Sequence, residues 1–384
     1  MFFYLSHKAL DMAARTSLEP FVSWLRLFRY ITFRSAGAAL TALLLSWWLY
    51  PRFIPWLKQS SFGQDYADRA EEAGGLQARI LSKKGTPTMG GLLIVLVLDV
   101  TAMMWAQWNT QVLLALFSVV VLCGLGFIDD YAKVTRRNSD GLRAFVKLWA
   151  QGALALFAAG YLWRLPATTT LISEVMVPFY KYPVATGGAG AVLGIALTAC
   201  TIVGASNAVN LTDGLDGLAI GCTVIVSFVF LVLTDVAGNA RAAAYLQIPY
   251  VPGAGELTVF CAAMLGAGLG FLWFNCHPAL VFMGDTGSLA LGGGLGVIAV
   301  LIHQPLVLAI AGGVFVAEAG SVIIQRTWFK YTKLRYGQGR RVFLRTPIHH
   351  HFELLGWYES QIVTRFYILC VLCAVVALST LKIR

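Results

Sequence analysis

Ten long runs of apolar residues dominate this sequence and leave few folds open to it. They lie near 30–50, 90–108, 112–128, 144–164, 191–210, 215–236, 257–274, 287–303, 305–328 and 362–381. A helix needs about 20 apolar residues to cross the hydrocarbon core of a bilayer. The chain is 58% hydrophobic and 12% charged, whereas a soluble domain carries about 25% charged residues. The sequence therefore predicts an all-α integral membrane protein with ten transmembrane helices, folded as one domain over residues 1–384.

Lysine and arginine are distributed unevenly between the loops that join these runs. The loops 51–89 and 129–147 and the stretch 326–365 hold nineteen of them, whereas the alternate loops hold three. Because basic residues favour the cytoplasmic side, we expect 51–89, 129–147 and 329–362 to be cytoplasmic and both termini to be periplasmic. The basic segment 1–29 departs from this rule, and we interpret it as an interfacial stretch. Clustering of the basic residues in loops favours membrane orientation over nucleic-acid binding.

Five aspartates lie where apolar runs end on the predicted cytoplasmic side: Asp129, Asp130, Asp213, Asp216 and Asp285. A carboxylate at membrane depth costs at least about 2.5 kcal/mol, so it is usually functional or paired. Each one alone is as easily a solvated loop residue, but five on one face indicate convergence on one site. Adjacent acids with a lysine one turn later, here Lys133, suit Mg²⁺ and phosphate, because Mg²⁺ takes oxygen ligands and shares them with phosphates.

A second polar cluster has its members three residues apart: Asn207, Asn210, Asp213 and Asp216. Three residues turn an α-helix by about 300°, so such a row drifts around the helix and does not converge. We therefore expect a break near Gly214, which would let two helix ends line one pocket. The alternative is a polar seam between two packed helices.

Two basic segments carry further candidates. The segment Lys83–Gly91 places cations, hydroxyls and flexible backbone at a helix start, which suits an anion. The segment Pro347–Glu353 contains three consecutive histidines, whose side chains point in different directions, so hydrogen bonding to phosphate is favoured over a zinc site. The candidate residues are Lys83, Thr88, His349, His350 and His351.

These blocks together resemble the phospho-N-acetylmuramoyl-pentapeptide-transferase family, a branch of the polyprenyl-phosphate N-acetylhexosamine-1-phosphate transferases. The resemblance runs from Thr32 to the last apolar run, and it rests on T-P-T-M-G-G, F-I-D-D-Y-x-K, N-A-V-N-L-T-D-G-L-D-G-L, F-N-x-x-P-A, M-G-D-T-G-S and P-I-H-H-H-F-E. The first and last of these blocks are specific to the muramoyl branch. The stretch 65–81 is longer than is usual in the family.

The resemblance implies a homodimeric, Mg²⁺-dependent transferase of the bacterial inner membrane. Its substrates would be UDP-MurNAc-pentapeptide and undecaprenyl phosphate, and its products UMP and lipid I, the first membrane intermediate of peptidoglycan synthesis. Asp285 would be the leading Mg²⁺ ligand, and Asp129, with Asp130 beside it, the base or charge-setter for the lipid phosphate. Direct displacement and a phosphorylated Asp129 both stay open.

The family also implies which residues contact the substrates. The UDP-sugar pocket would be lined by Lys83, Asn207, Asn210, Asp213, Asp216, Asn275, Phe282 and Gln325. Phosphates or the sugar-peptide would be contacted by Lys133, Lys147, His349, His350 and His351.

Two other functions fit part of the pattern. A relative that uses UDP-GlcNAc shares the acid blocks, and competition between the two nucleotide sugars would separate the two readings. A secondary transporter also has many helices and intramembrane acids, but it places them near the midplane between internal repeats. The sequence shows no such repeat, and its acids in mid-run, Asp99 and Glu318, are isolated.

Overall fold

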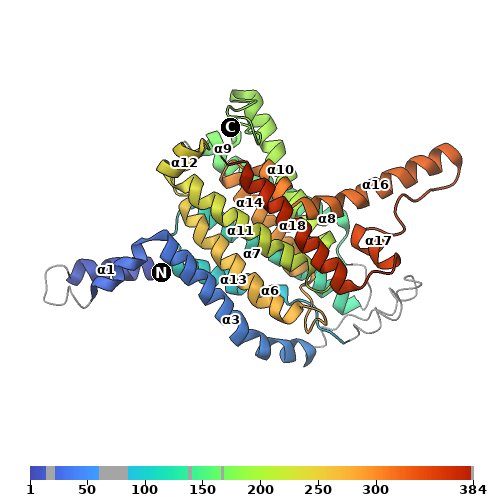
Figure 1. Ribbon diagram of the computed structural model, residues 1–384, viewed down its shortest axis with the longest axis horizontal. Coiled ribbons are helices and arrows are strands. Elements are labelled where there is room, and N and C mark those ends of the chain that lie inside the picture. The colour runs from blue at the N-terminus through green and yellow to red at the C-terminus, as the bar shows by residue number, and fades with distance from the viewer. Residues whose placement is uncertain (14–21, 60–84, 137–140, 166–167, 382–384) are drawn as a thin grey trace.

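The computed structural model describes residues 1–13, 22–59, 85–136, 141–165 and 168–381, and these form a bundle of helices with one isolated β-bridge (Figure 1). The elements are α1 (Phe2–Ala13), the 3₁₀ helix η1 (Ser23–Arg29), α3 (Ile31–Gln59), α6 (Gly91–Trp105), α7 (Thr110–Arg136), α8 (Ala144–Arg164), α9 (Thr170–Ser173), α10 (Gly187–Thr212), α11 (Leu218–Gly238), α12 (Ala240–Leu246), α13 (Gly255–Asn275), α14 (Gly284–Leu301), α15 (Pro305–Ala311), α16 (Gly313–Tyr336), α17 (Ile348–Leu354) and α18 (Glu359–Ser379).

Each of the ten predicted runs coincides with a helix or, for the run 305–328, with a bent helix pair. Seven described helices are long and apolar enough to cross a membrane, namely α7, α8, α10, α11, α13, α14 and α18. The pair α15 and α16 counts as an eighth, with a bend of 87° at Gly312. Helix α6 has 15 residues, or about 22 Å, which is short for a core of about 30 Å. The chain is therefore a multi-pass membrane protein, and the total of ten spans stays a prediction.

The helices extend further into the predicted loops than the apolar runs suggest. Helix α3 continues to Gln59, α7 to Arg136 and α16 to Tyr336, so the first residues of the predicted cytoplasmic loops 51–89, 129–147 and 329–362 are helical. The reason is that hydropathy falls where a helix leaves the apolar layer, whereas backbone hydrogen bonding continues through lysine, arginine and other good helix formers. Asp129, Asp130 and Lys133 consequently lie on regular helix.

Helix α14 forms the centre of the bundle and is buried from Thr286 to Leu301. It packs against α7 and α10. A side chain at Gly292 or Gly296 would collide with the backbone of α10, so these glycines permit the close approach of the two helices. This packing fixes the first turn of α14 beside the ends of α7 and α10.

The break predicted near Gly214 is confirmed, because α10 ends at Thr212 and α11 begins at Leu218. The bend at Gly312 sends α16 out of the bundle, where it projects with α17 beneath it (Figure 1). The N-terminal elements α1 and η1 extend sideways near α3 and contact the end of α6, with the Met1 ammonium donating to the carbonyl of Met103 at 2.9 Å and Phe28 stacked on Trp105.

Candidate active site

Two helix ends that are distant in the sequence bring three aspartates together. Asp129 and Asp130 come from the last turns of α7, and Asp285 comes from the first turn of α14. Their carboxylate oxygens lie within 4.8 Å of one another. The main chain of Gly126 faces that of Asp285 so closely that a Cβ would not fit there, which explains how the two helices approach. We call Asp129, Asp130 and Asp285 the carboxylate cluster.

Two lysines lie within the carboxylate cluster. Lys133 Nζ is 2.6 Å from Asp129 Oδ2 and 3.1 Å from Asp285 Oδ2. Lys147, from the first turn of α8, places Nζ 3.1 Å from Asp285 Oδ2 and 3.3 Å from Asp129 Oδ1. Three carboxylates therefore face two ammonium groups, which leaves one negative charge to be balanced. Such a pocket attracts a cation.

Asp130 is a buried member of the carboxylate cluster, and its hydrogen bonds are made by one of its two oxygens. Thr286 donates to Asp130 Oδ2 through its backbone N–H at 2.9 Å and its hydroxyl at 2.7 Å. Asp130 Oδ1 is buried and has no hydrogen-bond donor among the described residues. Gly284 packs against this carboxylate with φ of 75°, a conformation that suits only glycine well. Lys133 Nζ lies 3.7 Å from Asp130 Oδ1, which thus has hydrogen-bonding capacity left for a ligand.

The two asparagines of the second polar cluster have different hydrogen-bond partners. Asn210 donates to Asp285 Oδ1 at 2.8 Å and to the Ser288 hydroxyl at 2.9 Å, so it belongs to the carboxylate cluster. Asn207 instead donates to Gln151 Oε1 at 2.7 Å, and Gln151 donates to the buried Ser206 hydroxyl. The sequence analysis missed Gln151, because a single glutamine within an apolar run carries no motif.

The two aspartates of the turn between α10 and α11 face different partners. Burial raises the pKa of Asp213 to about 8, with the charges of Asp285, Asp130 and Asp216 acting in the same direction. Asp216 Oδ2 lies 3.0 Å from His277 Nδ1, and the backbone N–H of Asp216 donates to Glu359. His277 and Glu359 were also missed. The carboxamide oxygen of Asn275 accepts from the backbone N–H of Gly217 and so fixes the turn.

Of the other candidate residues, Phe282 and Thr88 lie near the carboxylate cluster and Gln325 lies on the projecting helix. Phe282 and Thr88 are brought near the cluster by backbone pairing, since the Phe282 N–H donates to the Pro87 carbonyl at 2.8 Å and Thr88 Oγ1 adjoins Gly284. Gln325 is on the projecting helix α16, where its carboxamide is bonded to the backbone of Phe343. Lys83 lies outside the described residues.

The three histidines have three different partners. His349 Nδ1 lies 3.1 Å from Glu318 Oε2, His350 Nδ1 lies 2.6 Å from Glu353 Oε2, and His351 Nδ1 accepts from the N–H of Leu344. Burial lowers the pKa of His350, and the Glu353 carboxylate acts in the opposite direction. Among the described residues, no group with metal-binding spacing includes these histidines.

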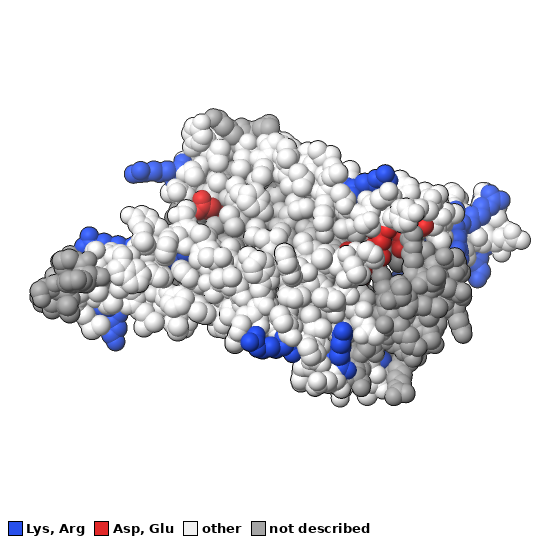
Figure 2. Space-filling view, turned by 60° about the horizontal axis from the view of Figure 1, so that its bottom comes forward, with Lys and Arg blue, Asp and Glu red and all other residues white. Residues whose placement is uncertain are grey.

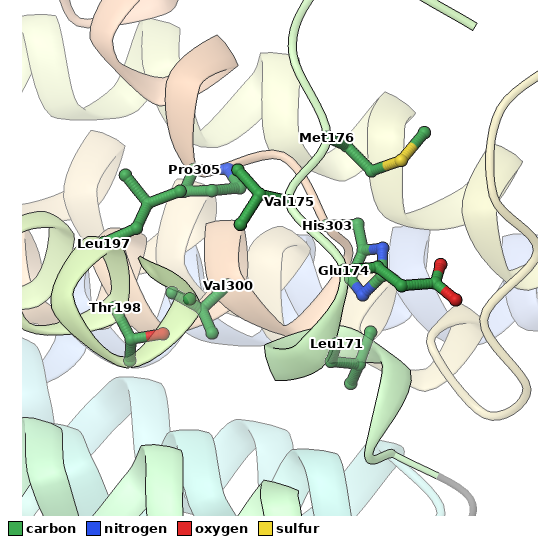
Figure 3. Close-up of a pocket in the computed structure, with 10 residues that line it drawn as sticks. Leu171, Glu174, Val175, Met176, Leu197, Thr198, Val300, His303 and Pro305 are labelled. Atoms are coloured by element: carbon green, nitrogen blue, oxygen red, sulfur yellow. The ribbon is translucent and has the colours of Figure 1, made fainter. Parts of the chain in front are cut away.

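Charge and cavities distinguish the two ends of the molecule. Figure 2 shows acidic side chains gathered at one end of the face in view, with lysine and arginine side chains nearby. Figure 3 shows a small pocket at the start of α10 and the turn from α14 to α15, lined by side chains such as Leu197, Val300 and His303. The carboxylate cluster lies at the opposite ends of α10 and α14, so this pocket is separate from it.

Comparison with known sequences agrees with this arrangement. Residues 112–303 match the model of glycosyl transferase family 4, and residues 83–95 match signature 1 of phospho-N-acetylmuramoyl-pentapeptide-transferase. The chain is 48% identical to the phospho-N-acetylmuramoyl-pentapeptide-transferase of Opitutus terrae over 367 residues, which cover 96% of this chain and 98% of that protein. It is 46% identical to the enzyme of the same name from Methylacidiphilum infernorum over 363 residues, or 94% and 96% of the two chains.

Proposed function

Because the chain belongs to the phospho-N-acetylmuramoyl-pentapeptide-transferase family, we propose that it transfers phospho-MurNAc-pentapeptide from UDP-MurNAc-pentapeptide to undecaprenyl phosphate. The products are UMP and lipid I. This is the first membrane step of peptidoglycan synthesis, on which cell-wall growth, cell shape and division depend. The observation that carries the proposal is the carboxylate cluster with its two lysines, since the reaction joins two phosphate groups.

Mg²⁺ is the proposed cofactor, with Asp285 as the leading ligand. The donor set fits, because Asp129, Asp130 and Asp285 offer oxygen atoms within 4.8 Å of one another and Asp130 Oδ1 accepts no hydrogen bond among the described residues. When bound, Mg²⁺ would neutralise charge on the two reacting phosphates. Lys133 and Lys147, which lie on the same carboxylates, would contact phosphate oxygens of the substrates.

The reaction begins with attack of a lipid phosphate oxygen on the phosphorus that carries the sugar, and UMP leaves. Catalysis of such a transfer is mostly positioning and charge neutralisation. Asp129 is fully buried, with Oδ1 accepting from the Leu142 N–H at 2.7 Å and Oδ2 beside Lys133. This burial favours a charge-setting role, in which Asp129 holds the two lysines, over attack by Asp129 itself, and therefore supports direct displacement.

The substrate pocket would extend from the carboxylate cluster over the neighbouring turns. Asn210, which donates to Asp285, and Asp213, whose carboxyl interacts with the charge of Asp285, suit the diphosphate. Asp216, Asn275, Phe282 and Thr88 suit the nucleoside part, with Lys83. Asn207 acts through Gln151 and Gln325 through Phe343, to which they are hydrogen-bonded. The three histidines His349, His350 and His351 suit the sugar-peptide.

The membrane arrangement follows from the substrates and the charge pattern. We propose ten spans with both termini periplasmic, and a site on the cytoplasmic face of the bacterial inner membrane, where the nucleotide sugar is available. The bend between α15 and α16 would open a groove for the polyprenyl tail. The chain acts as one domain over residues 1–384 and as a homodimer.

Release of UMP tests the proposal directly. The purified full-length protein, given Mg²⁺ and undecaprenyl phosphate, should release UMP from UDP-MurNAc-pentapeptide at a rate at least about 100-fold above that from UDP-GlcNAc, a difference of about 2.7 kcal/mol in the barrier. Chromatography of the nucleotide products measures both rates. Equal rates, or preference for UDP-GlcNAc, would assign the chain to the GlcNAc-1-phosphate branch instead.

A further inference from the structure

A row of polar side chains follows the covered face of the projecting helix α16. Glu318, Gln325 and Thr332 are seven residues apart, which is close to two helical turns, so they lie on one face. Glu318 and Thr332 are fully buried, whereas Ile323 and Leu334 on the same helix are exposed. A helix that projects from the bundle therefore has one protected polar face, and the chain that covers it is the basic loop 337–349.

Two members of the row hold the backbone of this loop. The Thr332 hydroxyl accepts from the Arg340 N–H at 2.8 Å. Gln325 Oε1 accepts from the N–H groups of Val342 and Phe343 at 2.9 and 3.0 Å, and its Nε2 donates to the Phe343 carbonyl at 3.2 Å. Each bond fixes a different point of the loop, so the row determines where its cations lie.

The third member of the row, Glu318, is charged and is linked to the candidate active site through His349. Glu318 and His349 are almost completely buried, with Oε2 of the acid 3.1 Å from Nδ1 of the ring. On its other side the imidazole lies against Gly214, where a Cβ would collide with Nε2. A carboxylate at membrane depth is retained when it has such a partner. Glu318 thus connects α16, through His349, to the turn between Asp213 and Asp216.

We infer that Glu318 is a positioning residue, which acts through His349 to hold the basic loop and this turn in the arrangement that binds the nucleotide sugar. Glu318 itself makes no contact with the carboxylate cluster among the described residues. Removing it therefore weakens substrate binding and leaves the reacting groups in place. The inference rests on the proposed function.

A double-mutant cycle tests the inference on the full-length protein. We expect Glu318→Gln to raise the KM for UDP-MurNAc-pentapeptide about tenfold, with kcat changed less than threefold, which is the pattern of binding lost equally in the ground state and the transition state. His349→Ala should raise KM at least as much, and the double variant should be no worse than His349→Ala alone, because residues that act as a unit are not additive.

Two further variants separate positioning from a general effect on folding. Gly214→Ala keeps Glu318 but displaces the imidazole, so it should raise KM in the same way. Asp99→Asn changes another buried acid in the bundle, which lies on α6 away from the loop, and should leave KM unchanged. Thermal melting checks that each protein is folded.

The outcomes are distinguishable. Effects of Glu318→Gln and His349→Ala that multiply in the double variant, or an unchanged KM in folded Glu318→Gln, would make Glu318 a packing residue and overturn the inference. Failure of the unmodified protein to release UMP would overturn the proposed function instead.

Discussion

Replacing Asp285 by asparagine is expected to lower kcat by about three orders of magnitude, or about 4 kcal/mol in the barrier. The change keeps the shape of the side chain but removes the charge that Lys133, Lys147 and Asn210 all face. It also removes the leading ligand of the proposed cation. Release of UMP under saturating substrate measures the effect.

The matched control is Asp235→Asn. Asp235 lies near the far end of α11, whereas the turn that adjoins the site precedes the start of that helix. This variant should retain the activity of the unmodified protein. A folded Asp285→Asn protein with full turnover would remove Asp285 from the chemistry.

Replacing Lys133 by methionine is expected to impair both stability and activity. The side chain is 13% exposed and lies between three carboxylates. Removal of one partner from a buried ion pair typically costs about 3–5 kcal/mol, because the remaining charge is left unpaired. The melting temperature should therefore fall in the absence of divalent cations and recover in part with Mg²⁺, while kcat falls at least about 100-fold, or about 2.7 kcal/mol.

Lys8→Met serves as the control for Lys133, since Lys8 is an exposed lysine on α1 at the other end of the molecule. Its melting temperature and activity should be unchanged. A Lys133→Met protein whose melting temperature equals that of the unmodified protein and does not respond to Mg²⁺ would show that the lysine does not compensate the carboxylates.

Much of the fold follows from local properties of the sequence. Apolar runs fix where helices cross a membrane, and the three-residue spacing of Asn207, Asn210, Asp213 and Asp216 requires the break near Gly214 that the structure contains. The acids at 129 and 285 could be expected to meet because the C-terminal end of α7 and the N-terminal start of α14 lie on the same predicted face of the bilayer. Glycine at 292 and 296 then allows α14 to pack closely enough.

Other features depend on contacts between distant residues and could not be predicted. Glu318 is an isolated acid in the sequence, but the bend at Gly312 and the return of the basic loop bring it to His349. Hydropathy does not determine the orientation of a helix about its own axis. It therefore could not show that Asn210 faces Asp285 while Asn207 faces Gln151. For the polar row on α16, the one signal in the sequence was the seven-residue spacing of Glu318, Gln325 and Thr332.

The binding of Mn²⁺, a spectroscopic substitute for Mg²⁺, tests most directly whether Asp129, Asp130 and Asp285 form one cation pocket. Electron paramagnetic resonance of the purified protein should detect one bound Mn²⁺ per chain, displaced by Mg²⁺ and lost in Asp285→Asn but retained in Asp235→Asn. Unchanged Mn²⁺ binding in Asp285→Asn, or no binding to the unmodified protein with its substrates present, would contradict the account.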